Sequence, residues 1–186
     1  MVRRYPEGSD EDRELLMRLS PDALLDLLFL QVRNVWRVDG LYFLLIEERF
    51  GTEVASRIDA EFWEQMAAIE AAQLLRLFEK EKNPGIPECI RLLRLSGWAL
   101  DQPFKTISVS EREAEISVIE CRTQDARMAK GREVFPCREV RLGYLREFAG
   151  TINPSIGVRC ISCPPERTAH DCWCRWRFFL KERAGE

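Results

Sequence analysis

Six of the seven cysteines in this 186-residue chain lie between positions 121 and 174, and their spacing is the feature that most readily suggests chemistry. Cys160 and Cys163 are three residues apart and are followed by two prolines, which predicts a turn. Two thiolates at this spacing on a turn can both reach one cation, as they do in zinc and iron–sulfur sites. The pair therefore predicts a site for zinc or an iron–sulfur cluster.

A second pair, Cys172 and Cys174, opens the last expected strand, which should pair with the strand that holds Cys160. In a regular strand, side chains two residues apart share a face and are separated by about 6.5–7 Å. Thiolates bound to one tetrahedral zinc ion are only about 3.8 Å apart. We therefore expect Cys174, and not Cys172, to join Cys160 and Cys163.

Two further cysteines are expected near this pair. Cys121 ends the second expected strand, and Cys137 precedes a helix, whose first backbone N–H groups favour a thiolate. The predicted metal-ligating set is Cys121, Cys137, Cys160, Cys163 and Cys174. Two alternatives stay open: a hydrolase of a small C–N or C–S substrate that uses one of these thiols as nucleophile, and thiols that are merely packed. Cys89 stands alone in an expected helix and is interpreted as a small buried hydrophobe.

Other candidate residues are more isolated. Gln124 and Arg127 share a helical face next to Cys121, where they could bind a ligand's carboxylate or simply cap and pair. His170 is the only histidine; it could take part in ligation or proton transfer, or be an exposed loop residue. A pocket between helices, or a plain core, would use Trp36, Asp39, Tyr42 and Glu47.

The composition excludes several classes of protein. There are 28 basic and 31 acidic residues, 46% of the chain is hydrophobic and 32% is charged, which is ordinary for a globular domain. A net charge of −3 argues against a nucleic-acid partner. No apolar run approaches the roughly 20 residues of a membrane span, and the first residues do not form a secretory signal. We expect a cytoplasmic protein with no membrane partner, a possible small-molecule ligand and reduced thiols; the oligomeric state stays open.

The first part of the chain has helical periodicity. Ser20, Pro21 and Asp22 form a helix start, and Asp39-Gly40 is a point where that helix could break or bend. Asp59 is a plausible cap for the next long helix. The expected helical segments are residues 24–36, 41–50, 60–82 and 86–95. We expect one domain over residues 1–186, with a helical subregion over residues 1–102.

Residues 103–186 form the second, cysteine-rich subregion, in which alternating β-branched residues predict strands. Strands are expected over residues 104–109, 114–121, 156–161 and 173–181, and helices over 123–131 and 139–149. The predicted fold is α+β, in β-β-α-β-β order, with the helical half packed on a four- to five-stranded antiparallel sheet.

A family of uncharacterised prokaryotic cytosolic proteins resembles this chain over about residues 20–181. The resemblance is carried by Asp39-Gly-Leu-Tyr-Phe43, Glu47-Glu-Arg-Phe-Gly51, Cys121, Gln124, Ala126-Arg127, Gly131, Phe135-Pro-Cys137, Phe148-Ala149, Ile152-Asn-Pro154, Cys160-x-x-Cys163-Pro-Pro165 and Trp173-Cys174-x-Trp176-x-Phe178. The chain also resembles, more distantly, 4-vinyl reductase-type and aminothiazoline-carboxylate hydrolase-like domains. That resemblance implies an α+β fold with cysteines late in the chain, and a ligand or metal for the first of these groups.

Overall fold

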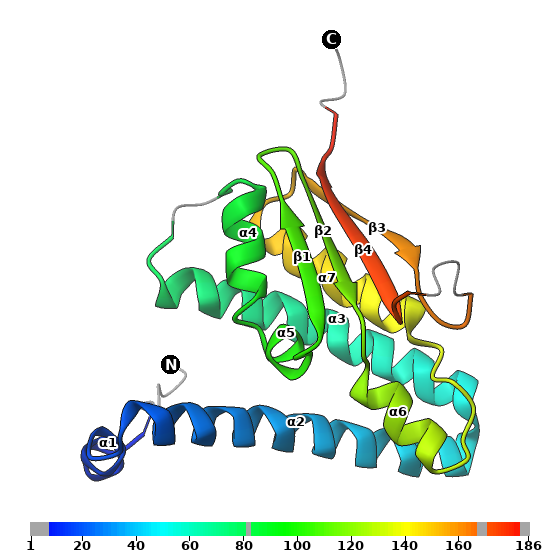
Figure 1. The fold of residues 1–186 in the computed structure, drawn as a ribbon, viewed down its shortest axis with the longest axis horizontal. Helices are drawn as coiled ribbons and strands as arrows, with labels where there is room; N and C mark the ends of the chain where they lie inside the picture. The colour runs from blue at the N-terminus through cyan, green and yellow to red at the C-terminus, as the bar shows by residue number, and fades with distance from the viewer. Residues whose placement is uncertain (1–7, 81–82, 167–170, 183–186) are drawn as a thin grey trace, which may run out of the picture.

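The computed structural model describes residues 8–80, 83–166 and 171–182. It shows an α+β fold in which a helical half packs on a four-stranded antiparallel sheet, as predicted (Figure 1). The elements are α1 (Asp10–Met17), α2 (Pro21–Phe50), α3 (Thr52–Leu77), α4 (Ile86–Leu93), α5 (Gly97–Asp101), β1 (Lys105–Val109), β2 (Glu113–Val118), α6 (Arg122–Ala129), α7 (Cys137–Ile152), β3 (Ile156–Ser162) and β4 (Cys174–Leu180). Two helices, α6 and α7, separate the two β-hairpins, where helices were expected over residues 123–131 and 139–149.

The sheet has the strand order β1-β2-β4-β3, so the last strand lies inside it. In β4, buried and exposed side chains alternate as the sequence predicts: Trp176 and Phe178 are fully buried, whereas Arg177, between them, is exposed. The predicted pairing of the last strand with the strand of Cys160 is confirmed, since Cys160 faces Trp176 across the ladder. The register shifts between Cys160 and Ser162, which bends the end of β3 toward the turn that follows.

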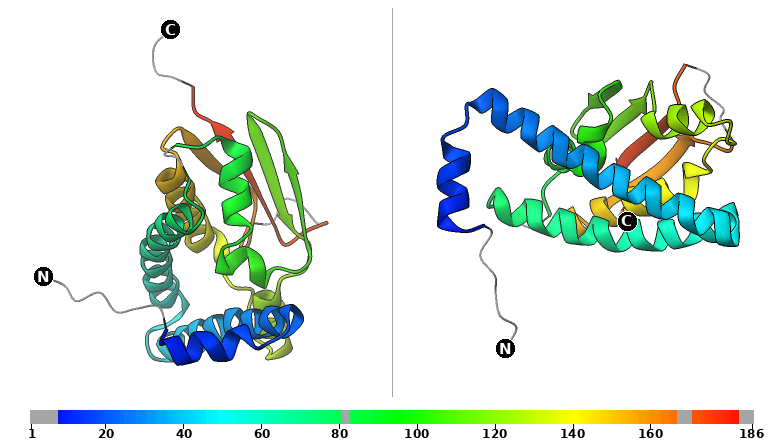
Figure 2. Two further views of the ribbon diagram at one scale, coloured as in Figure 1. Left: turned by 90° about the vertical axis from the view of Figure 1, so that its left-hand side faces the viewer. Right: turned by 90° about the horizontal axis from the view of Figure 1, so that it is seen from below.

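Helix α7 links the helices to the sheet. It packs against β3 on one side and against α3 on the other (Figures 1 and 2). Alanines on α3, such as Ala67 and Ala71, are completely buried and allow the two helices to approach closely. Tyr144 and Phe148 of α7 fill the space between these layers. The first turn of α7 is thereby held at one end of the sheet.

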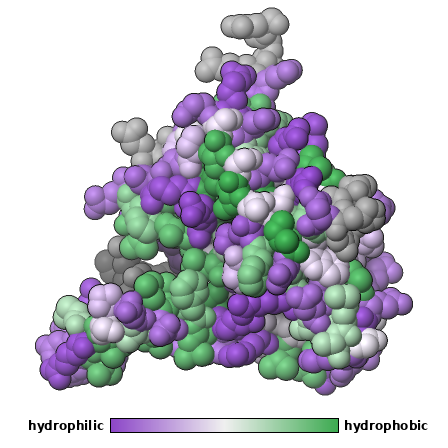
Figure 3. All heavy atoms as spheres, in the orientation of Figure 1, coloured by the Kyte–Doolittle hydropathy of each residue, from purple (hydrophilic) through white to green (hydrophobic). Residues whose placement is uncertain are grey.

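Helix α2 is longer than predicted. The expected break at Asp39-Gly40 does not occur, because one glycine costs a helix only about 1 kcal/mol and Asp39 accepts a hydrogen bond from Trp63 Nε1 of α3 at 3.0 Å. Phe43 is the one residue of α2 that is fully enclosed. Other apolar side chains along the helix remain exposed: Leu24, Leu25, Leu28, Phe29 and Leu30. Figure 3 shows hydrophobic residues at the surface in the lower part of this face of the molecule.

Helix α3 begins earlier than predicted. It starts at Thr52, directly after Gly51, whose φ of 84° lies in the region that glycine adopts readily. The expected cap, Asp59, consequently lies two turns inside the helix and is buried. Helices α2 and α3 meet at Gly51 and diverge toward their other ends (Figure 2). Asp39 and Asp59 thus face each other across this helical pair.

Smaller differences concern the ends of elements. Helix α3 ends at Leu77 and not at residue 82, and β2 ends at Val118, three residues before Cys121. Cys121 instead precedes the first residue of α6. Within the described ranges, no helix has both the length and the apolar character that crossing a bilayer requires.

Candidate functional site

Four of the late cysteines come together at one end of the sheet. The thiol of Cys163 lies in hydrogen-bonding contact with those of Cys137, Cys160 and Cys174. Cys137 is the first residue of α7, Cys160 is in β3, Cys163 is in the turn after β3, and Cys174 opens β4. The structure therefore brings four of the five predicted ligating cysteines into one cluster, which we call the thiol cluster.

Backbone contacts hold the three segments of the thiol cluster together. The Arg138 N–H in the first turn of α7 donates a hydrogen bond of 3.0 Å to the carbonyl of Pro164, just after Cys163. Arg138 also forms an ion pair with Glu166 on the far side of the same turn. In the ladder between β3 and β4, Ser162 pairs with Arg175, which directly follows Cys174. The turn is consequently fixed against the start of α7.

The surroundings divide the thiols into two electrostatic types. The contact with Cys163 and the nearby Arg141 guanidinium lower the pKa of Cys137 to about 7, against the opposing effect of burial. The pKa of Cys160 is also lowered, again mainly by the contact with Cys163. Side-chain contacts with Cys137, Cys160 and Cys174 raise the pKa of Cys163, because these contacts favour its protonated form. The S–H of Cys163 thus favours the thiolate form of Cys137 or of Cys160 by donating to one of them.

The other cysteines lie apart from this cluster. Cys121 is close enough to influence Cys137 electrostatically, but burial raises its pKa to about 12 and it does not share the contacts of Cys163. Cys172 precedes β4, and its thiol contacts Asp171. Cys89 is fully buried in α4, as predicted for a small hydrophobe, and burial raises its pKa to about 12. Among the residues that the structure describes, no three His, Cys, Asp or Glu side chains are already grouped around a point that could hold a metal ion.

A cavity of about 400 Å³ adjoins the thiol cluster. Its walls come from α2, α3, α5, α6 and α7, and both Cys137 and Cys174 line it. Trp36 and Trp63 form one wall as a stacked pair, with ring centroids 4.7 Å apart and planes inclined by 11°. The volume falls within the range of small-molecule sites in proteins, which is about 300–1,000 Å³.

Arg141 is the most unusual residue of this cavity. Only 6% of its surface is exposed, and its guanidinium carbon lies 5.0–5.9 Å from the ring centroids of Trp36, Trp63, Trp98 and Tyr144. Its Nε and Nη1 atoms have no hydrogen-bond partner. Cation–π attraction holds the charge here, but the N–H groups lack the acceptors that buried donors normally have.

Three carboxyl groups also line the cavity. Burial and the neighbouring Asp39 raise the pKa of Asp59 to about 8, so it carries a proton at neutral pH. The pKa of Asp39 is raised too, mainly by burial, and the two carboxyl groups hydrogen-bond to each other. Asp101 forms an ion pair with Arg33, and its pKa is raised because burial outweighs that pairing. The sequence reasoning did not identify Asp59, Asp101 or Arg141; charged residues within otherwise apolar helix faces were the available signal.

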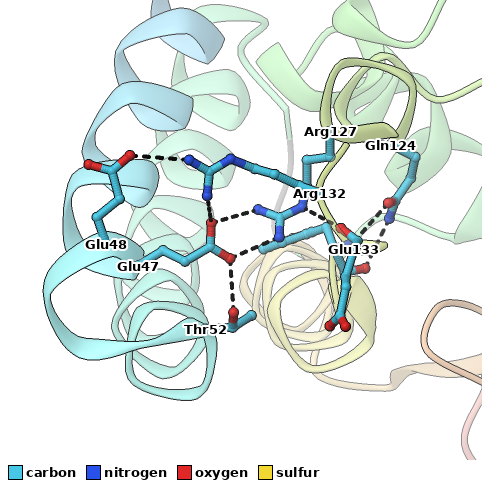
Figure 4. A network of polar contacts seen from close by, with 8 residues as sticks. Glu47, Glu48, Thr52, Gln124, Arg127, Arg132 and Glu133 are labelled. Carbon is cyan, nitrogen blue, oxygen red and sulfur yellow. Dashed lines mark hydrogen bonds and ion pairs between the residues drawn. The ribbon is translucent and has the colours of Figure 1, made fainter. Parts of the chain in front are cut away.

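The predicted ligand-binding residues, Gln124 and Arg127, line the cavity but are occupied by the protein itself (Figure 4). Gln124 accepts from the Phe135 N–H at 2.9 Å and donates to the Phe135 carbonyl at 3.0 Å. Arg127 donates to both carboxylate oxygens of Glu47, at 2.8 and 3.1 Å, and to the carbonyl of Glu133 at 2.9 Å. Both side chains are thus buried and paired within the protein, and neither caps α6 or lies on the surface.

The remaining candidate residues from the sequence lie in different parts of the structure. Trp36 and Asp39 line the cavity, whereas Tyr42 is 67% exposed and points away from the core. Glu47 receives Arg127 and also Arg132, at 2.9 Å, so it links α2 to the segment after α6. His170 lies outside the described residues.

Comparison with known proteins identifies a family whose function is unknown. No curated protein matches the chain, and the resemblance to 4-vinyl reductase-type and aminothiazoline-carboxylate hydrolase-like domains finds no support. The model of a family of unknown function, DUF6125, matches residues 17–180, which fits the expectation of an uncharacterised family. The cysteines of the thiol cluster and the lining of the cavity all fall within the matched residues. The chain therefore belongs to the DUF6125 family.

Proposed function

We propose that this protein binds a thiophilic metal ion through Cys137, Cys160, Cys163 and Cys174, with zinc or an iron–sulfur cluster as the occupant. The observation that supports the proposal is the position of Cys163, whose thiol touches three other thiols from α7, β3 and β4. Four cysteines from three segments are the ligand set of structural zinc sites and of many iron–sulfur clusters.

The electrostatics of the cluster agree with a cation at its centre. Without a metal, the other three thiols lie around the Cys163 thiol, which keeps its proton. A metal ion would displace the shared protons and turn the same side chains toward itself, because metal ligation requires thiolates. Arg141 would then offset part of the negative charge of the ligands from outside the site. Cys121, with its raised pKa and without a contact to Cys163, is left out of the proposed set.

Metal analysis of anaerobically purified protein tests this proposal. About one zinc per chain, or iron with equimolar sulfide and visible absorption, is the expected result. Cys163→Ser should lose the metal and lower the melting temperature by several degrees, because metal binding contributes directly to folding stability. Cys172→Ser is the matched control and should retain the metal. Two results together would refute the site: wild-type protein that contains no metal, and variants that melt at the same temperature as wild type. These variants carry a single change to Ser at Cys160, Cys163, Cys172 or Cys174.

A cysteine-dependent hydrolase of a small C–N or C–S substrate is the second candidate. The observation that favours it is that Cys137 begins α7, faces the cavity and has Arg141 one helical turn later. In such a reaction the Cys137 thiolate would add to the electrophilic carbon of the substrate, and the C–N or C–S bond would break with proton transfer to the leaving atom. Water would then release the acyl group and restore the thiol.

Alkylation kinetics distinguish the two candidates. If Cys137 is a nucleophile in metal-free protein, iodoacetamide should modify it first, and Cys137→Ser should remove the fast phase. Cys121→Ser is the control and should keep that phase. Slow, uniform alkylation of all the cysteines in metal-free protein would exclude the hydrolase.

A further inference from the structure

We propose that the cavity beside the thiol cluster binds a small organic carboxylate with an apolar, ring-sized body, and that Arg141 receives its carboxylate group. This inference does not depend on a metal in the thiol cluster, since it rests on residues of the cavity wall. Four observations carry it: the unpartnered guanidinium atoms, the aromatic walls, the pairing of the other buried charges, and the volume.

Arg141 selects for an anion. Its side chain is 94% buried, and Nε and Nη1 have no acceptor within the protein. A buried donor left without a partner is costly, and the cost is larger when the group is charged. A carboxylate that entered the cavity would bring an acceptor and a negative charge to a guanidinium that is already stripped of water.

The neighbouring acids do not fill this role. The carboxyl groups of Asp39 and Asp59 hydrogen-bond to each other, and Asp39 also accepts from Trp63 Nε1 at 3.0 Å. Neither provides an acceptor to Nε or Nη1 of Arg141. The guanidinium thus has a pair of acids nearby and a side-chain hydrogen bond with Cys137, and its Nε and Nη1 atoms are still left without an acceptor.

One anionic group, and not a multiply charged phosphate, fits the remaining cations. Arg33 is paired with Asp101, Arg127 with Glu47, and Arg132 with Glu47 and Glu48, so these charges are already balanced. Arg37, Arg122 and Lys130 also line the cavity but are exposed to solvent, which screens them. They can attract an anion toward the opening, whereas Arg141 is the cation that meets it inside.

The aromatic walls define the rest of the ligand. Trp36 and Trp63 stack in parallel, and Trp98 and Tyr144 complete the surround of the Arg141 guanidinium. Flat aromatic walls favour a flat or apolar body through dispersion and burial of apolar surface. About 400 Å³ lies at the small end of ligand sites, which favours a molecule of about one ring over a nucleotide or a peptide.

Tryptophan fluorescence provides the test, because Trp36, Trp63 and Trp98 all line the cavity. Wild-type protein is titrated with benzoate, indole-3-acetate and hexanoate, with benzamide as the uncharged isostere of benzoate, and with inorganic phosphate. We expect saturable quenching by at least one carboxylate, with benzamide at least about tenfold weaker than benzoate, since a charge-assisted pair is worth about 1.5–3 kcal/mol and a factor of ten is about 1.4 kcal/mol. Phosphate should not compete.

Variants then assign the effect to Arg141. Arg141→Met should abolish carboxylate binding, and Arg141→Lys should weaken it about tenfold while it keeps the charge. Arg146→Met, which removes an exposed arginine from the same helix, is the matched control and should bind as wild type does. Melting curves show whether each variant is folded; the Lys variant keeps the test decisive if the Met variant is not.

Three results would overturn the proposal. The first is that none of the three carboxylates binds the folded wild-type protein with a dissociation constant below about 5 mM, roughly 3 kcal/mol of binding free energy. The second is that benzamide binds as tightly as benzoate, or that phosphate displaces the carboxylates. The third is that folded Arg141→Lys binds with unchanged affinity, or that Arg146→Met loses binding to the same extent as the Arg141 variants.

Discussion

Two buried arginines that line the same cavity have similar surroundings but different partners. Arg127 of α6 is 8% exposed, and its guanidinium carbon lies 5.6 Å from the ring centroid of Phe43 and 5.8 Å from that of Phe135. Arg141 of α7 is 6% exposed and lies over four rings. Arg127 uses its nitrogens on Glu47 and the Glu133 carbonyl, whereas Arg141 leaves Nε and Nη1 open.

This difference indicates a structural role for Arg127 and supports the proposed binding role of Arg141. The contacts of Arg127 with Glu47 join segments 80 residues apart in sequence, so they fix α6 against the end of α2 (Figure 4). Nε and Nη1 of Arg141 have no partner within the fold, and Arg141 lines a cavity large enough for a ligand. Removing one partner of a buried, fully paired charge is strongly destabilising, whereas a buried charge that the protein leaves unpaired points to an external partner.

The largest expected effect comes from breaking the paired arginine. Arg127→Met leaves Glu47 buried without its bidentate partner, although Arg132 still contacts it. We expect a loss of about 3–5 kcal/mol in the free energy of unfolding, measured by urea denaturation. Arg141→Met removes unpartnered donors and should cost about 1 kcal/mol or less. Equal losses from the two variants would contradict the comparison.

A smaller effect, which depends on pH, concerns the acid pair beside Arg141. The pKa of Asp59 is raised to about 8 in the folded protein, so its stabilising contribution is complete below about pH 4 and is lost as the pH rises through 8. Asp59→Asn keeps a donor to Asp39 without the ionisation. Its stability should match wild type near pH 4 and exceed it by more than about 1 kcal/mol at pH 8, since one pKa unit corresponds to about 1.4 kcal/mol.

Melting temperatures of both proteins between pH 4 and pH 8.5 provide the measurement. Asp26→Asn, which removes an exposed carboxylate of α2, is the control for charge removal and should show no such growing difference. A difference between wild type and Asp59→Asn that stays constant with pH would show that Asp59 ionises as an ordinary carboxyl group.

The smallest effect is expected at Cys89, a buried thiol with no charged neighbour. Burial alone raises its pKa to about 12, in contrast to Cys137, whose thiolate is stabilised by Cys163 and Arg141. Cys89→Ala should cost at most about 1–2 kcal/mol and leave the metal content unchanged. Loss of metal from this variant would show that burial does not separate the packed thiol from the proposed ligands.

The thiol cluster was largely predictable, because the constraints that build it are short-range. The Cys160-x-x-Cys163 turn and the strand that opens at Cys174 follow from spacing and alternation, and antiparallel pairing brings them together. Cys121 was expected to join them, but β2 ends three residues before it, and Cys121 instead lies directly before the first residue of α6. A strand end shifted by a few residues is enough to move one thiol out of contact.

The sequence by itself determined the α+β division near residue 103, the helix start at Ser20 and the alternation that buries Trp176 and Phe178, because each depends on neighbours in the chain. Only the tertiary structure decided the cavity. Asp39, Asp59 and Arg141 come from three helices, and nothing local shows that a charge on an apolar helix face will meet an acid or a tryptophan from another helix. The helix-to-helix packing sets these encounters, and it also determines that Arg127 finds Glu47 whereas Arg141 is left with open donors.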